Sequence, residues 1–203
     1  MSGEPLIEVR GLSKSFGRRA VLTGVELKVG PGELVGVTGE NGSGKSTLLK
    51  ILAGRLRPDA GTWVLRGRLG YCPQEPLVFG RLTVAENFAC FAAAYGLTDW
   101  RPAEDDLLGR FRFAPYARTP VHELSAGTRQ KLNLALALLP GPDVLLLDEP
   151  YSGFDWETYL HFWECAESLR AAGRGLLVVS HFVYERGRFD RLCALRDGKL
   201  WEA

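Results

Sequence analysis

The sequence contains little cysteine, and its cysteines are widely spaced. The four among 203 residues form no C-x-x-C pair, and they are Cys72, Cys90, Cys165 and Cys193. Disulfide frameworks and cysteine zinc sites use closely paired cysteines. We therefore expect neither, and we interpret all four as small core residues in a reducing cytoplasm.

The sequence also lacks a long hydrophobic run and an excess of either charge. No stretch approaches about 18 uninterrupted apolar residues, and residues 1–5 lack a basic region followed by an apolar run. We expect a soluble chain that is not exported. Lys plus Arg number 25 and Asp plus Glu 24, so no overall field attracts nucleic acid or anionic lipid. No nucleic-acid partner is expected.

The length and composition favour one α/β domain with room for a small subdomain, because 46% of the 203 residues are hydrophobic. Short β-rich runs predict strands at 7–9, 25–29, 34–37, 62–65, 69–72, 144–147 and 176–179, and a closing hairpin at 192–196 and 199–202. Helices are predicted at 46–53, 84–95, 105–111 and 126–139. The continuously apolar run 144–147 is typical of a strand buried on both faces.

Aromatic and apolar residues follow residue 155 with the i, i+3, i+4, i+7 spacing of one helix face. They are Trp156, Tyr159, Leu160 and Trp163. Aromatics at this spacing belong to a core more often than to a ligand platform. We predict that this face is buried.

The segment 39–46 fits the phosphate-binding pattern G-x-x-x-x-G-K-[ST] and follows the apolar run 34–37. Its glycines allow consecutive backbone N–H groups to face one anion, and the following helix adds its positive end. Lys45 would reach the β and γ phosphates, and the Ser46 hydroxyl would ligate Mg²⁺. The alternative is a glycine-rich turn that binds nothing. The candidate nucleotide ligands are Gly39, Asn41, Gly42, Ser43, Gly44, Lys45, Ser46 and Thr47.

Further motifs occur in a fixed order around this loop. The segment 124–131 reads L-S-A-G-T-R-Q-K, 145–150 reads L-L-L-D-E-P, 152–155 reads S-G-F-D, 178–181 reads V-V-S-H and 71–74 reads Y-C-P-Q. With the phosphate loop and Phe16, these segments resemble the signature, Walker B, D-loop, switch-histidine, Q-loop and adenine-stacking elements of the ATP-binding-cassette (ABC) family. The resemblance extends from about Leu12 to Lys199.

The resemblance implies an α/β fold of the P-loop NTPase type, with a mainly parallel core sheet, an antiparallel β subdomain and a helical subdomain. Residues 1–73 and 136–203 would form the catalytic core with the β subdomain. Residues 74–135 would form the helical subdomain with the signature motif. The short span from Asp59 to Gln74 suggests a trimmed β subdomain, and we expect no regulatory domain after the final hairpin.

The resemblance also assigns roles to individual residues. Asp148 would hold Mg²⁺ through water, Glu149 would activate the attacking water, and Gln74 would touch the metal or that water. His181 would donate to the γ-phosphate. Taken alone, the D-E-P segment is equally consistent with an ordinary polar end of a strand.

The signature and the stacking residue carry open questions. Ser125 and the Gly127 backbone begin a predicted helix, which in the family caps the nucleotide of the other subunit. Ala126 and Thr128 depart from the family's glycine and glutamine. Phe16 either stacks on adenine or is a core aromatic.

The implied function is that of the ATP-hydrolysing subunit of an ABC membrane transporter, with ATP and Mg²⁺ as cofactors. Its partners would be a separate transmembrane permease and a second cassette, in a homodimer or a heterodimer with another ABC ATPase. It would lie in the cytoplasm, peripheral on the inner face of the cell membrane, and its compactness leans toward small exporters. The alternatives are soluble ABC ATPases of iron-sulfur cluster assembly or of DNA and ribosome function.

Overall fold

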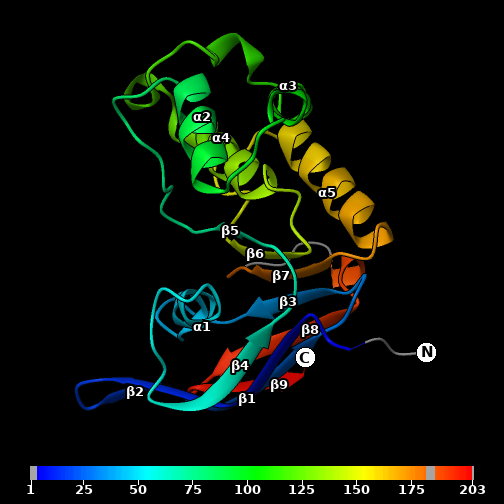
Figure 1. The fold of residues 1–203 in the computed structure, drawn as a ribbon. Coiled ribbons are helices and arrows are strands. Elements are labelled where there is room, and N and C mark those ends of the chain that lie inside the picture. Colours follow the sequence, from blue (N-terminus) through cyan, green and yellow to red (C-terminus); the bar gives the residue numbers. More distant parts are fainter. Residues whose placement is uncertain (1–3, 182–185, 203) are drawn as a thin grey trace.

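The computed structural model describes residues 4–181 and 186–202, which form two sheets with helices between and above them (Figure 1). The antiparallel sheet has the order β2-β1-β4, from β1 (Ile7–Phe16), β2 (Arg19–Val29) and β4 (Ala60–Leu65). The larger sheet has the order β5-β6-β7-β3-β8-β9. Its strands are β3 (Leu34–Thr38), β5 (Leu69–Cys72), β6 (Val144–Asp148), β7 (Gly175–Val179), β8 (Arg191–Arg196) and β9 (Lys199–Glu202). In this sheet β9 pairs antiparallel with β8, and the pairs among β5, β6, β7, β3 and β8 are parallel.

The helices cover the two faces of the larger sheet. They are α1 (Lys45–Leu52), α2 (Val84–Ala94), α3 (Arg101–Arg110), α4 (Ala126–Leu138) and α5 (Trp156–Ala171), with short 3-10 turns at Ala114–Tyr116, Val121–Glu123 and Arg186–Arg188. In Figure 1, α1 lies on the side of the antiparallel sheet, and α2, α3, α4 and α5 lie on the opposite side. The predicted fold class is therefore observed.

Strand β6 lies in the core, as its continuous apolar run predicts. Leu145 and Leu147 pack into the cluster that contains α2, α4 and α5, whereas Val144 and Leu146 pack into the cluster that contains α1 and the antiparallel sheet. Successive side chains of a strand point to opposite faces, so a strand with both faces covered must be apolar throughout. This burial holds the carboxyl end of β6 rigidly against its neighbours.

The predicted strands and helices are all observed, with shifts at their ends. Helix α3 begins at Arg101 rather than Asp105, with Pro102 in its first turn, a position that suits proline because the first helical N–H groups have no partner within the helix. The final hairpin turns at Asp197 and Gly198, both with positive φ, as a two-residue hairpin turn requires. The boundaries at residues 73 and 135 stay a prediction.

Two burial predictions are wrong in part. Trp163 is buried, but Trp156 is 69% exposed and stacks on Tyr159 with ring centroids 5.5 Å apart. Trp156 begins α5 immediately after a loop, beyond the reach of the core that covers the later turns of the helix. Cys90 is exposed on α2, whereas the other three cysteines are buried; the face of α2 that carries Cys90 does not meet the helices packed behind it.

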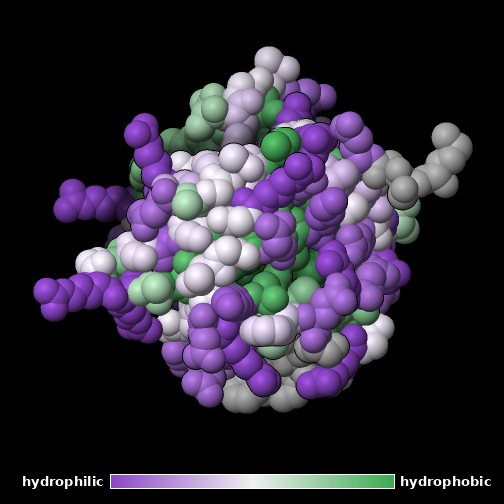
Figure 2. Space-filling model, turned by 90° about the horizontal axis from the view of Figure 1, so that it is seen from below, coloured by the Kyte–Doolittle hydropathy of each residue, from purple (hydrophilic) through white to green (hydrophobic). Residues whose placement is uncertain are grey.

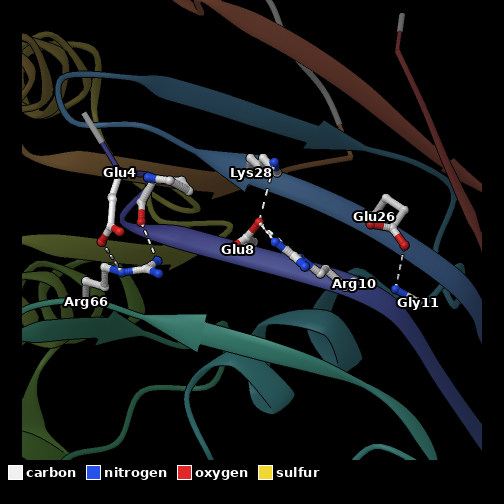
Figure 3. Close-up of polar contacts among 8 residues, drawn as sticks. Glu4, Glu8, Arg10, Gly11, Glu26, Lys28 and Arg66 are labelled. Carbon is white, nitrogen blue, oxygen red and sulfur yellow. Dashed lines mark hydrogen bonds and ion pairs between the residues drawn. The ribbon is translucent and has the colours of Figure 1, made fainter. Parts of the chain in front are cut away.

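The antiparallel sheet carries charged side chains that fit its strand register. Glu8 pairs across the strands with Lys28 and along its own strand with Arg10, at 3.4 Å and 2.7 Å (Figure 3). The Glu26 carboxylate accepts a hydrogen bond from Gly11 N at 2.6 Å. Exposed pairs of this kind contribute little stability, but they favour one register. From below, hydrophilic side chains surround the hydrophobic ones (Figure 2).

Candidate nucleotide site

The predicted phosphate loop connects β3 to α1, as the sequence indicates. Gly39 and Gly44 have φ of 155° and 110°. A Cβ on Gly39 would lie 2.6 Å from the Leu195 carbonyl oxygen, and one on Gly44 would lie 2.9 Å from the Val21 carbonyl oxygen. Only glycine fits these two positions, so the loop is shaped by strands β2 and β8 as well as by its own sequence.

The Lys45 side chain folds back into the loop and is only 7% exposed as a residue. Its Nζ donates hydrogen bonds to the carbonyl oxygens of Gly39 at 2.6 Å and Glu40 at 3.0 Å. Burial lowers the pKa of Lys45, and the nearby carboxylates of Glu149 and Asp148 offset only part of this effect. A buried ammonium beside a concave loop attracts an anion.

Asp148 ends β6 and is 2% exposed. Burial raises its pKa, and a hydrogen bond with the Ser46 side chain acts in the opposite direction. A desolvated carboxylate and a hydroxyl are hard oxygen donors that suit Mg²⁺. Substrate phosphates and water usually complete the coordination shell of this ion. Among residues 4–181 and 186–202, no group of three or more His, Cys, Asp or Glu side chains could hold a metal by itself. Asp148 and Ser46, which are hydrogen-bonded to each other, supply two oxygen donors that fit a metal bound together with phosphate.

Glu149 is the strained residue of this region. It follows β6 with φ of 49°, which is uncommon for a residue other than glycine and costs free energy that the surroundings must supply. Its Oε1 accepts a hydrogen bond from His181 N at 2.6 Å and lies 2.6 Å from His181 Nδ1, and its Oε2 accepts one from Ser180 Oγ at 3.0 Å. The carboxylate is thus fixed by the segment that follows β7.

One cavity of about 440 Å³ brings most of the predicted site residues together. Its lining includes Phe16, Asn41, Gly42, Gly44, Lys45, Ser46, Thr47, Gln74, Asp148 and Glu149. A neighbouring cavity is lined by the predicted residues Gly39, Asn41, Gly42, Ser43 and His181.

Phe16 is 52% exposed, so the alternative that it is a core aromatic is wrong. The Lys14 ammonium lies 5.6 Å from its ring centroid. One face of the cavity therefore carries a half-exposed aromatic ring, and its stacking on adenine stays a prediction.

Ser125 and Gly127 lie outside both of these cavities. Ser125 is exposed and caps α4, where its Oγ accepts a hydrogen bond from Thr128 N at 3.1 Å. The Thr128 hydroxyl lies 2.9 Å from the same oxygen, so the threonine that departs from the family pattern reinforces the cap. Within one chain, Ser125 and Gly127 therefore do not line the cavities that contain the phosphate loop.

Gly127 is required by a contact that the sequence does not reveal. A Cβ there would lie 2.5 Å from the Gly153 carbonyl oxygen, so the first turn of α4 rests directly on the loop after β6. Any other residue at 127 would push these two segments apart.

Two further residues of the site were missed by sequence reasoning. Arg19 lines both cavities and donates from Nη2 to the Gly42 carbonyl oxygen at 3.0 Å. Ser180 is 2% exposed and holds Glu149. The position of Ser180 directly before His181 was a usable signal, whereas Arg19 lies in no motif and is brought to the loop only by the β1–β2 hairpin.

Comparisons with known proteins agree with these observations. A family model described as ABC transporter matches residues 22–152. The chain is 37% identical to "Nod factor export ATP-binding protein I" of Paraburkholderia xenovorans, over 97% of this chain and 69% of that protein. It is 34% identical to "Lipopolysaccharide export system ATP-binding protein LptB" of Acidithiobacillus ferridurans, over 98% of this chain and 89% of that protein.

Solved structures show the same fold. A structure of an ATP binding subunit of an ABC transporter superposes with a TM-score of 0.90 at 29% identity, covering 96% of this chain and 88% of that one. A dimeric bacterial ABC transporter cassette superposes with a TM-score of 0.85 at 24% identity, covering 96% of each chain. The chain belongs to the ABC transporter family. It is an ATP-binding subunit with ATPase activity, and the predicted family, fold class and enzymatic activity are confirmed.

No helix in residues 4–181 and 186–202 combines the length and apolar character needed to cross a bilayer.

Proposed function

We propose that this ATPase powers export through a separate membrane-spanning permease, with which it associates at the inner face of the cell membrane. The names of its relatives, an exporter subunit for Nod factor and one for lipopolysaccharide, support the direction. The single observation that carries the docking proposal is an exposed apolar surface on the segment that follows Gln74 and on helix α2.

This surface, termed here the aromatic ridge, consists of Leu77, Phe79, Phe91 and Tyr95. Leu77, Phe79 and Tyr95 are 40%, 54% and 40% exposed. The ring centroids of Phe79 and Phe91 are 6.1 Å apart, and those of Phe91 and Tyr95 are 6.2 Å apart. Clustered exposed aromatics are typical of protein interfaces. A partner docked here would lie next to the chain segment that carries Gln74 into the nucleotide cavity.

The proposed chemistry follows from the cavity. The phosphate loop and Lys45 bind the phosphates of ATP, and Phe16 stacks on the base. Glu149, held by Ser180 and His181, orients and activates the attacking water. Ser46, Asp148 and Gln74 would hold Mg²⁺, which would supply charge stabilisation for phosphoryl transfer. His181 donates to the γ-phosphate.

The signature completes the site from a second cassette. Ser125 is exposed at the N-terminus of α4, and Gly127 lies in the first turn of this helix. A helix N-terminus favours an anion. In a two-fold dimer, each ATP lies between the phosphate loop of one subunit and the signature of the other. The partner cassette is either a second copy of this chain or another ABC ATPase.

The docking proposal is tested by purification from the native source in detergent, with the bound membrane chain identified by mass spectrometry. Phe79→Asp places a charge in the aromatic ridge and should remove the permease from the purified material while the isolated subunit still hydrolyses ATP. The matched control is Trp201→Asp, since Trp201 is also exposed, at 57%, but lies on β9. Retention of the membrane chain by Phe79→Asp, or its loss from both variants, would contradict docking at the ridge.

A further inference from the structure

Helix α4 carries two buried amide side chains, Gln130 within the segment 124–131 and Asn133 just beyond it, to which no role in the site has been given above. Gln130 and Asn133 are 4% and 3% exposed, and they lie three residues apart, on one side of the helix. A buried amide costs free energy unless its polar atoms find partners. The partners of these two therefore show what the pair is built to hold.

Asn133 holds both sides of the segment that contains Gln74. Its Nδ2 donates to the Pro73 carbonyl oxygen at 2.8 Å and to Cys72 Sγ at 3.2 Å. Its Oδ1 accepts a hydrogen bond from Leu77 N at 3.3 Å. Gln74 thus lies between two backbone groups that one side chain connects.

Gln130 connects Asn133 to the backbone of Glu149 and Pro150. Its Oε1 accepts a hydrogen bond from Asn133 Nδ2 at 3.3 Å, and its Nε2 lies 3.4 Å from the carbonyl oxygens of both Glu149 and Pro150. These bonds are longer than the Asn133–Pro73 bond, so their geometry is sensitive to small shifts of α4.

Gln130 contacts the backbone at a residue with an unfavourable conformation. Glu149 has φ of 49°, and such a conformation persists only where the surroundings determine it. The Glu149 side chain is fixed by Ser180 and His181, and its carbonyl oxygen faces Gln130. The side chain and the backbone of Glu149 are therefore restrained by two different segments of the chain.

We propose that Gln130 and Asn133 form an amide bridge that sets the position of Gln74 relative to Glu149, and that both are positioning residues for ATP hydrolysis. The proposal rests on the roles proposed above for Gln74 and Glu149. Neither amide touches the nucleotide cavity, because neither is among the residues that line it. The bridge acts by holding Gln74 and Glu149, which flank the attacking water, at fixed relative positions. A small misplacement of such groups reduces the rate of the chemical step more than it weakens binding.

The test compares the kinetics of two variants that delete the bridge with a variant that only weakens the core. Asn133→Leu and Gln130→Met keep approximate side-chain size and remove the hydrogen bonds. Each should lower kcat about 10- to 100-fold while the KM for ATP stays within about two-fold of wild type. The double variant should be scarcely slower than either single one, because the two amides act as a unit. The matched control is Leu134→Ala, at a buried position of the same helix that is 1% exposed, which should lower the melting temperature while kcat stays within about two-fold.

Thermal melts establish that each variant is folded, and Gln130→Met carries the test alone if Asn133→Leu does not fold. A kcat within about two-fold of wild type in the folded bridge variants, or an equal loss in Leu134→Ala, would overturn the bridge. Glu149→Gln, measured in parallel, separates this failure from failure of the underlying roles. If Glu149→Gln turns over normally, the assigned chemistry is wrong; if it is inactive while the bridge variants are normal, only the bridge is wrong.

Discussion

The phosphate loop and the signature both offer a helix N-terminus to an anion, yet the structure builds them differently. Lys45, Asp148 and Glu149 are 7%, 2% and 7% exposed and lie within a cavity formed by distant parts of the chain. Ser125 is exposed, and its cap is local, to Thr128 three residues later. The first region is enclosed by distant parts of the chain, whereas the second is an exposed helix end. In the two-fold dimer proposed above, the signature of one subunit would cover the nucleotide held by the loop of the other.

The largest expected effect comes from Glu149→Gln, which tests whether the loop side contains the catalytic base. The amide keeps the shape of the side chain but cannot accept a proton, so hydrolysis should fall by orders of magnitude while ATP binding persists. We expect the variant to accumulate as an ATP-bound dimer. Steady-state phosphate release and molecular mass in ATP check both points, and near-normal turnover would remove Glu149 from the catalytic role.

An intermediate effect is expected when variants in the two regions are mixed. Lys45→Ala, in one chain, removes the charge that faces the phosphates and should weaken ATP binding. Ser125→Arg, in a separate chain, should block the signature of that chain. In a mixed dimer, one interface combines both lesions and the other is intact. Half of randomly mixed dimers are hetero and each has one good site, so ATPase activity should recover to roughly a quarter of the wild-type value if the sites are independent.

This experiment needs a homodimer, confirmed by mass in ATP with Glu149→Gln. Each single variant measured alone gives the baseline. With that control in place, absence of recovery on mixing would mean that the site lies within one chain or that both sites must act together. Recovery would establish that the phosphate loop of one subunit and the signature of the other form one shared site.

The smallest effect concerns Phe16, at the rim of the loop side. Phe16→Ala should weaken ATP binding by on the order of 1–3 kcal/mol through lost stacking. The melting temperature of the nucleotide-free protein should change little, because the ring is already 52% exposed. Trp201→Ala is the matched control, since it removes another exposed aromatic that lies outside both cavities. Calorimetric titration checks the difference, and equal ATP affinities in wild type and Phe16→Ala would rule out stacking.

Much of the fold follows from local patterns in the sequence. The run 144–147 indicated a strand covered on both faces, and it lies between the two hydrophobic clusters. Asp197 and Gly198 indicated a hairpin and adopt positive φ. These features depend on neighbouring residues only, because backbone conformation and the alternation of buried faces are local properties. The spacing of glycines, lysine and serine in 39–46 likewise determined that the chain has a phosphate loop.

Other features depend on the order of strands in the sheet, which local patterns do not reveal. Strand β6 pairs with β7, and this pairing brings His181 against Glu149. Strand β3 pairs with β8, and this pairing brings the end of β8 against Gly39. The burial of Trp163 but not Trp156 likewise reflects where the core ends along α5. The amides of α4 meet the Q-loop segment only because that helix packs across the carboxyl ends of β5 and β6. Hydrogen bonds between residues 19 to 60 positions apart depend on how whole helices and strands pack together. The sequence alone therefore determined the phosphate loop, whereas the tertiary structure decided which residues surround it.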